Sequence, residues 1–288
     1  MDVATAIGFI ALLSVFLAIS LAIANRKLKV QEDPRIGRVE EMLPGANCGA
    51  CGFPGCRAFA ENVVAGKVLP GQCPVGGPET ARIVADYLGV DAGQTLKKVA
   101  RLLCAGSRQV APQIAEYDGY PSCRAAAAVT GGFKGCVYGC LGLGDCVEAC
   151  TFDAMFMAPN GLPMIDVEKC TGCGDCVRAC PKGILELYPI SQHLIVQCKS
   201  LLAGDEALAF CEVACTGCGI CAADAPEGLI IMKNNLPIIQ QDQLNLETEL
   251  ATLRCPTGAI TWVDGQQFPE GFQQWKIEKQ EAKTSRVV

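Results

Sequence analysis

Cysteine is the residue type whose number and spacing in this sequence could do chemistry. The chain has 288 residues and 20 cysteines, and eight of these cysteines lie between positions 136 and 180. The second half of this stretch reads Cys170-x2-Cys173-x2-Cys176-x3-Cys180-Pro181. Closely spaced thiolates bind zinc ions or iron–sulfur clusters. A metal site is therefore expected in this stretch.

The spacing from Cys170 to Pro181 is typical of paired [4Fe–4S] clusters, in which the fourth cysteine of the run binds the other cluster. Gly172 and Gly174 let the backbone turn tightly around a metal core, and Pro181 fixes the chain as it leaves. We expect one cluster on Cys150, Cys170, Cys173 and Cys176, and another on Cys136, Cys140, Cys146 and Cys180.

Structural zinc and disulfide bonds are the two alternatives for these cysteines. Zinc also uses paired C-x2-C groups, but rarely three cysteines at two-residue gaps with a second set interleaved. Disulfide frameworks belong to short secreted chains, whereas this chain has 288 residues. Iron–sulfur chemistry is favoured over both.

A separate group of four cysteines lies nearer the N-terminus. The string from Asn47 to Cys56 reads N-C-G-A-C-G-F-P-G-C, and Cys73-Pro74 follows it at a distance. Helices are expected at 35–43, 57–65 and 78–88, with Gly66 and Gly89 as stops. Zinc would suit this group too, but the ferredoxin-type run favours iron. We expect a cluster on Cys48, Cys51, Cys56 and Cys73.

The C-terminal cysteines repeat the central ones at one constant offset in the numbering, which predicts a duplicated module. Cys123, Cys136, Cys140, Cys146 and Cys180 correspond to Cys198, Cys211, Cys215, Cys221 and Cys255. The ligands of the Cys170 cluster correspond to Ala225, Asn245, Thr248 and Ala251, so the second module keeps one cluster only. Leu143 corresponds to Cys218, and we expect the cluster on Cys215, Cys218, Cys221 and Cys255. Whether Cys211 or Cys218 is the ligand stays open; spacing favours Cys218.

Four [4Fe–4S] clusters account for sixteen cysteines and leave Cys104, Cys123, Cys198 and Cys211. Cys104 is interpreted as a small buried apolar residue, the usual fate of a free cysteine. For the other three, an extra ligand or a redox-active thiol competes with that interpretation. Hairpin strands are expected at 154–158 with 162–166 and at 229–232 with 236–239.

The N-terminal segment carries no charged residue from Val3 to Ala24. As a helix it would reach about 33 Å, enough for a hydrocarbon core of about 30 Å. Basic residues follow it at 26, 27 and 29, which predicts that the chain after the segment is cytoplasmic and the N-terminus outside. A cleaved signal peptide would have a basic start and a shorter apolar core. An uncleaved single-pass anchor is therefore expected.

The anchor, the N-C-G-A-C-G-F-P-G-C string and the ferredoxin run, in this order, resemble the B subunit of the Rnf complex over residues 1–190. The resemblance implies a membrane-anchored relay that takes electrons from soluble ferredoxin. Partner subunits with flavins would reduce NAD⁺ and translocate Na⁺ or H⁺ at the bacterial cytoplasmic membrane. The chain would be part of an oxidoreductase without a catalytic site of its own. The alternatives are an iron–sulfur subunit of another membrane oxidoreductase and a reductase subunit for a redox-sensing regulator.

The expected fold class is α+β, built from small domains stabilised by metal. We expect an anchor (1–30), a helical four-cysteine domain (31–95), a connecting segment (96–122), ferredoxin-like modules (123–190 and 191–265) and a polar tail (266–288). The formal charge of −6 and the lack of long basic runs argue against nucleic acid as a partner. The sequence has no G-x-G-x-x-G or P-loop motif in a strand–helix setting. His193, the only histidine, is interpreted as a surface or strand residue.

Overall fold

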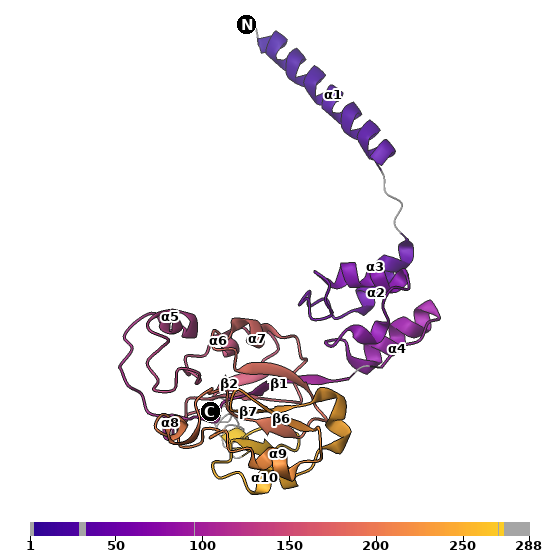
Figure 1. Cartoon of the computed structure of the whole chain (residues 1–288). Coiled ribbons are helices and arrows are strands. Elements are labelled where there is room, and N and C mark those ends of the chain that lie inside the picture. The colour runs from indigo at the N-terminus through magenta and orange to yellow at the C-terminus, as the bar shows by residue number, and fades with distance from the viewer. Residues whose placement is uncertain (1–2, 29–32, 95, 270, 274–288) are drawn as a thin grey trace, which may run out of the picture.

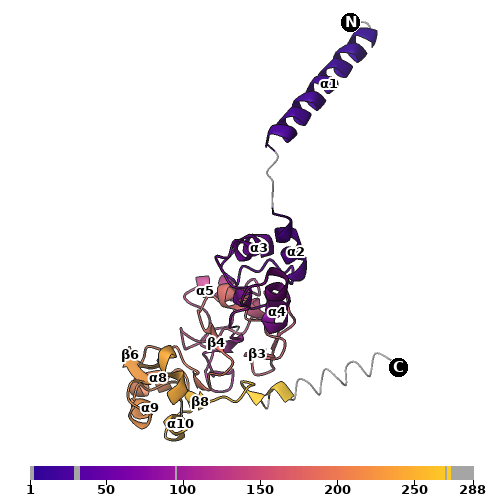
Figure 2. The same cartoon turned by 90° about the vertical axis from the view of Figure 1, so that its right-hand side faces the viewer.

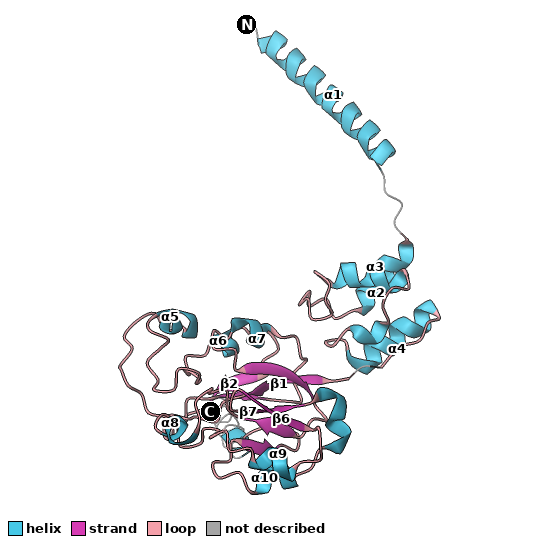
Figure 3. Ribbon diagram, viewed as in Figure 1, coloured by secondary structure: helices cyan, strands magenta, loops and turns pink. Residues whose placement is uncertain are grey.

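The computed structural model describes residues 3–28, 33–94, 96–269 and 271–273. It combines one long helix, a small helical domain and a part in which short strands alternate with short helices (Figures 1 and 3). The protein is thus a mixed helix and strand protein, as expected. The part of the predicted polar tail beyond residue 273 lies outside the described residues.

Helix α1 (Val3–Leu28) stands apart from the rest of the chain (Figures 1 and 2). Large apolar side chains along it are exposed, among them Phe9, Leu12 and Leu21. Within the described residues it is the one helix long and apolar enough to cross a membrane. A helix that is apolar all round needs an apolar environment, which a lipid bilayer supplies.

The helical domain contains three helices around the first cysteine group, close to their predicted positions. They are α2 (Pro34–Met42), α3 (Cys56–Val64) and α4 (Gly77–Leu88), with a 3₁₀ turn at Pro70–Gln72. The Asp33 side chain accepts a hydrogen bond from the Arg35 amide and caps α2. Gly89, at φ 68°, ends α4 in the left-handed conformation that glycine adopts without strain. Val39, Phe59 and Val84 form the centre of this domain's core.

In the described part of the chain, the strands form four two-stranded antiparallel sheets. Two are the predicted hairpins, β2 (Met155–Met157) with β3 (Pro163–Ile165) and β6 (Ile230–Lys233) with β7 (Leu236–Ile239). In the other two, β1 (Lys98–Leu102) pairs with β4 (Leu185–Pro189), and β5 (Leu194–Val196) pairs with β8 (Ile260–Trp262). We call residues 98–190 the first unit and residues 194–263 the second unit.

Short helices connect these strands and carry many of the cysteines. In the first unit they are α5 (Cys123–Ala128), α6 (Asp145–Glu148) and α7 (Asp175–Ala179). In the second unit they are α8 (Gly204–Leu208), α9 (Ile220–Asp224), the 3₁₀ stretch Gln241–Leu246 and α10 (Leu250–Leu253). None is longer than two turns, so tertiary contacts rather than helix propensity must hold them.

Two segments are more structured than the sequence indicated. The expected connecting segment contains β1, which pairs with β4 along its whole length. At the C-terminal end, the Gln267 side chain is buried and makes hydrogen bonds of 3.0 and 2.8 Å to the backbone N–H and C=O of Leu102. Phe272 packs against Phe156 with ring centroids 5.9 Å apart. The chain therefore returns from the second unit to the first within the segment expected to be a polar tail.

The strand pairing also changes one correspondence between the two units. Leu185 and Ile260 stand at the same offset as Cys180 and Cys255, and they pair with Leu102 and Val196 respectively. Cys198 lies two residues after Val196, and Cys104 lies two residues after Leu102. Cys104 is thus the structural counterpart of Cys198. The numerical match between Cys123 and Cys198 does not reflect position in the fold, because Cys123 starts α5, well beyond the end of β1.

Candidate metal centres

The first cysteine group lines a cavity of about 320 Å³ at the end of the helical domain, and its members are Cys48, Cys51, Cys56 and Cys73. The loop is held by Asn47, whose Oδ1 accepts a 2.8 Å hydrogen bond from the Cys56 amide. The Gly76 amide lies 3.4 Å from Cys73 Sγ. The four cysteines grouped on spacing therefore face one space.

The cysteines around α7 form a second group, made up of Cys150, Cys170, Cys173 and Cys176. Burial raises the pKa of Cys176 to about 12, with smaller contributions from Cys170, Cys173 and Cys150. The Ala100 amide on β1 lies 3.5 Å from Cys170 Sγ. A strand within the expected connecting segment therefore supports this group.

Arg101, the neighbour of Ala100, is fully buried beside this second group. Its Nη1 donates a 2.7 Å hydrogen bond to the Gly265 carbonyl, but Nε and Nη2 have no hydrogen-bond partner among the described residues. Burial lowers the pKa of Arg101, and the charge of a Cys170 thiolate acts in the opposite direction. A buried charge needs a counter-charge. A cluster bound by four thiolates would supply it, so the residues present fit such a group.

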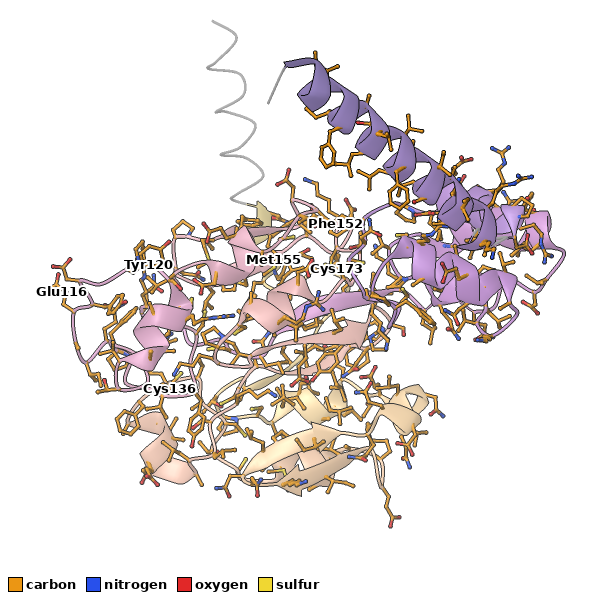
Figure 4. The ribbon with its side chains drawn as sticks, turned by 90° about the horizontal axis from the view of Figure 1, so that it is seen from above. Glu116, Tyr120, Cys136, Phe152, Met155 and Cys173 are labelled. Atoms are coloured by element: carbon orange, nitrogen blue, oxygen red, sulfur yellow. The ribbon has the colours of Figure 1, made fainter. Side chains whose placement is uncertain are left out.

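The third group departs from the expected ligand set. Cys140, Cys146 and Cys180 line a cavity of about 370 Å³, and the fourth cysteine in its wall is Cys123. Cys136 lies elsewhere, at the edge of the first unit beside α8 and away from Cys173 (Figure 4). This arrangement favours Cys123 over Cys136 as the fourth ligand.

Local hydrogen bonds explain how Cys123 reaches this cavity. Burial raises the pKa of the Cys123 thiol, and the backbone amides of Asp145, Leu143 and Gly144 act on its sulfur in the opposite direction. The Asp145 carboxylate accepts hydrogen bonds from the Cys123 amide at 2.7 Å and the Ser122 hydroxyl at 2.9 Å. An aspartate in a cluster loop is usually exposed to solvent. Asp145 instead connects the start of α5 to α6 through these hydrogen bonds. In the sequence, only its position directly before Cys146 pointed to a role at the site.

The fourth group lies in the second unit. Cys215, Cys218, Cys221 and Cys255, the four cysteines expected to act together there, line a cavity of about 330 Å³. Burial acts to raise the pKa of Cys255, but the amides of Ile260 and Thr257 and the Thr257 hydroxyl outweigh it and lower the pKa overall. Hydrogen bonds to sulfur favour the thiolate that a metal binds. Cys211 does not line this cavity, which supports the spacing argument for Cys218.

The cysteines that remain after these four groups also lie together. Cys104, Cys136, Cys198 and Cys211 line a cavity of about 340 Å³ between the two units. Sequence spacing does not place these four cysteines in one site, because they are far apart along the chain. Only the packing of the second unit against the first brings them to one place.

The spacing of these thiols bears on which metal they hold. Tetrahedral zinc, with Zn–S bonds of about 2.3 Å, requires four sulfurs within about 4 Å of one another. Within the described ranges, no three His, Cys, Asp or Glu side chains are close enough to share one metal ion. In a cubane cluster each thiolate binds a different iron, so the sulfurs stand farther apart.

Replacing Arg101 tests the charge argument. Arg101→Gln is expected to lower the reduction potential of the cluster on the second group, because reduction adds negative charge that the guanidinium stabilises. At an effective dielectric of about 20, one nearby charge contributes on the order of 2 kcal/mol, or on the order of 100 mV for one electron. Potentiometric EPR titration would measure the shift. Arg101→Lys keeps the charge and serves as the control; equal potentials in the Gln and Lys variants would contradict the argument.

Comparisons with known proteins place these groups in a class. Residues 43–75 match an "Fe-S cluster" family, and residues 135–184 match the family described as "4Fe-4S dicluster domain". Cysteines in these two segments thus belong to iron–sulfur cluster motifs, and the protein is an iron–sulfur protein with a 4Fe–4S dicluster domain.

Relatives over most of the chain narrow the class to one family. The chain is 43% identical over 255 residues to the B subunit of the "Na(+)-translocating ferredoxin:NAD(+) oxidoreductase complex" of Acetobacterium woodii, covering 88% of this chain and 76% of the relative. It is 44% identical over 242 residues to the B subunit of the "Proton-translocating" complex of Clostridium ljungdahlii, covering 83% and 85%. It is 38% identical over 207 residues to the B subunit of the "Ion-translocating oxidoreductase complex" of Methanosarcina acetivorans, covering 72% of this chain and 78% of the relative. The chain belongs to the B-subunit family of Rnf-type ion-translocating oxidoreductase complexes.

His193 has a structural role among the described residues. Its ring stacks on Trp262 with centroids 4.7 Å apart, and Nδ1 lies 3.1 Å from the Val263 carbonyl oxygen. It lines none of the cysteine cavities described above. This agrees with its interpretation as a strand-associated residue.

Proposed function

We propose that the chain is a membrane-anchored relay that carries electrons, one at a time, through a series of [4Fe–4S] clusters. The observation that supports this most is the placement of the four-cysteine groups in adjoining parts of the fold. The proposed ligand sets are Cys48, Cys51, Cys56 and Cys73; Cys150, Cys170, Cys173 and Cys176; Cys123, Cys140, Cys146 and Cys180; and Cys215, Cys218, Cys221 and Cys255.

Contacts between these groups support an order for the relay. Arg178 on α7 donates a hydrogen bond of 3.4 Å to the Cys48 carbonyl, so the helical domain adjoins the group on Cys170, Cys173 and Cys176. Helices α6 and α7, which carry Cys146 and Cys176, pack against each other in the first unit. The second unit lies at the far end from α1 (Figure 2). Electrons would pass along this line between the helical domain and the second unit.

The electron donor and the partner subunits are proposed from the family. The names of the Acetobacterium and Clostridium relatives specify ferredoxin and NAD⁺, and a cytoplasmic ferredoxin would meet the cluster-bearing part of this chain. Other subunits would hold flavins, reduce NAD⁺ and translocate Na⁺ or H⁺, because α1 carries no charge in its apolar stretch and provides no ion path.

Duplication of a ferredoxin-like module is supported by the matching hairpins β2–β3 and β6–β7.

Rapid mixing would test the proposed function directly. The complex is purified from membranes without oxygen and mixed with reduced ferredoxin, and the visible absorbance of the clusters is followed. Bleaching of this chain's clusters before NADH appears is expected. Reduction of NAD⁺ that precedes cluster bleaching, or stoichiometric zinc in place of iron, would rule the relay out. Reduction of a regulator without any ion gradient would favour the redox-control alternative.

Removing the anchor should change where the chain is found. A variant that lacks residues 1–30 is expected to move from the membrane fraction to the soluble fraction, because α1 is the apolar span. Its iron content should stay unchanged, since all cysteines lie beyond residue 47. Membrane fractionation with an iron assay measures both. A full-length chain found soluble in the absence of its partners would contradict the anchor.

A further inference from the structure

We propose that Cys104, Cys136, Cys198 and Cys211 bind a fifth [4Fe–4S] cluster that bridges the two units. The inference rests on the proposed iron–sulfur function and extends it. It assigns a ligand role to the four cysteines outside the other groups, including Cys104, which was expected to be only a buried apolar residue. All 20 cysteines would then be cluster ligands.

The cavity between the units has the size of the other cluster cavities. With its solvent-exposed side included, it measures about 340 Å³, against about 320, 330 and 370 Å³ for three of the groups above. Gly106 forms part of its wall, and a Cβ placed there would lie 3.2 Å from Cys211 Sγ and 3.6 Å from Cys104 Sγ. The two sulfurs come from different units and turn toward the same space.

The four cysteines form two equivalent pairs, one from each unit. Cys104 and Cys198 occupy the same position after β1 and β5, and Cys136 and Cys211 are related by the constant offset of the repeat. Cys136 and Cys211 each begin a turn, closed by hydrogen bonds of 2.9 Å from Gly139 N–H and 3.1 Å from Ala214 N–H to their carbonyls. Each unit therefore contributes two cysteines, at equivalent chain positions, to the four ligands that a cubane needs.

Backbone amides at equivalent positions of the two units lie against one sulfur in each half of the site. The Cys140 amide lies 3.4 Å from Cys104 Sγ, and the Cys215 amide donates to Cys198 Sγ. Cys140 and Cys215 are themselves proposed ligands of the neighbouring clusters in the first and second units. One backbone link on each side thus joins the bridging site to the next site.

A buried positive charge faces the site. Lys134 is 6% exposed and lines the cavity, and its Nζ donates to the carbonyls of Gly106 and, at 3.0 Å, of Cys140. Among the described residues, no carboxylate pairs with it. Burying an ammonium group without a counter-charge is unfavourable. A cluster with four thiolates carries net negative charge and would provide that counter-charge.

The position of the site gives the cluster a role. The cluster on Cys140 lies on one side of it and the cluster on Cys215 on the other. One electron leaves a reduced [4Fe–4S] cluster of the first unit and reduces the bridging cluster. The bridging cluster then passes that electron to the cluster of the second unit, and no proton or bond is exchanged. Without the bridge, the second unit's cluster would be separated from the first unit's clusters by the whole interface.

Counting iron in variants of the full chain tests the bridging cluster. Anaerobically purified wild type is expected to hold about 20 iron atoms and Cys198→Ala about 16, since a [4Fe–4S] cluster has four iron atoms. The double variant Cys198→Ala/Cys211→Ala should also hold about 16 iron atoms, because both cysteines would serve one cluster. Ser200→Ala, a buried neighbour on the same loop, is the matched control and should keep all of its iron.

A second variant keeps every thiol and tests the same site without removing a cysteine. Gly106→Val is expected to lose the same cluster, since its side chain would occupy the space between Cys104 and Cys211. Wild type with about 16 iron atoms, unchanged by Cys198→Ala, would overturn the bridging cluster and leave the relay standing. Wild type with little iron or with zinc would overturn the proposed function as well.

Discussion

Replacement of Cys123 by alanine is expected to remove one [4Fe–4S] cluster from the first unit, and a second change, Leu143→Cys, is expected to restore it. The first unit lacks a cysteine at position 143, where the second unit has Cys218. The Cys123 sulfur lies against the amides of Leu143, Gly144 and Asp145. Cys123 would therefore take the place of the missing cysteine.

The rescue relies on matching backbone conformations in the two units. Leu143 stands between Gly142 and Gly144, with φ values of 73° and 90°, and Cys218 stands between Gly217 and Gly219, at 69° and 76°. A cysteine at position 143 should point its sulfur as Cys218 does. The chain would then hold a regular C-x2-C-x2-C run with Cys140 and Cys146.

Iron analysis and EPR of the reduced protein would measure this result. Cys123→Ala should lose about four iron atoms and one cluster signal, and Cys123→Ala/Leu143→Cys should regain both. Leu143→Cys alone is the control and should keep the wild-type iron content. Full iron in Cys123→Ala would show that Cys136, the ligand expected from spacing, completes this cluster instead.

Removal of the iron is expected to unfold most of the chain outside α1. The sheets have two strands of three to five residues each, and isolated two-stranded hairpins are marginal in water. Cysteines are members of the main core clusters, for example Cys140 and Cys176 in the first unit and Cys221 in the second. Metal binding in small domains contributes on the order of 10 kcal/mol or more to folding.

The buried thiols make the folded state dependent on the metal. Burial raises the pKa of Cys140 to about 12 and of Cys215 to about 11. At neutral pH these thiols are protonated unless iron binds them, and metal binding then releases the protons. Without iron, each cavity of about 320 to 370 Å³ would be lined by neutral thiols, and the metal–sulfur bonds that connect the surrounding loops would be absent.

Circular dichroism and thermal unfolding after anaerobic chelation would measure the loss. The expected result is the absence of a cooperative transition on heating, with residual helix from α1. Reconstitution with ferrous iron and sulfide should restore the transition. An iron-free protein that still unfolds cooperatively would show that side-chain packing alone stabilises the two units.

The sequence alone determined the chemistry and most of the local structure. The C-x2-C-x2-C runs and the N-C-G-A-C-G-F-P-G-C string indicated iron–sulfur clusters, because ligands on one short loop share one site whatever the rest of the chain does. Helices α2, α3 and α4 and the hairpins β2–β3 and β6–β7 lie close to their predicted positions. Apolar periodicity, caps and turn residues are local signals and could be recognised without the fold.

Only the tertiary structure decided which distant cysteine joins which group. Cys104, Cys123 and Cys136 all precede the ferredoxin run at separations along the chain that allow each to reach more than one site, and closing a longer loop costs little more. Spacing therefore could not separate Cys123 from Cys136. The pairing of β1 with β4 and the packing of the second unit against the first place Cys104 and Cys136 between the units and leave Cys123 to face Cys140, Cys146 and Cys180.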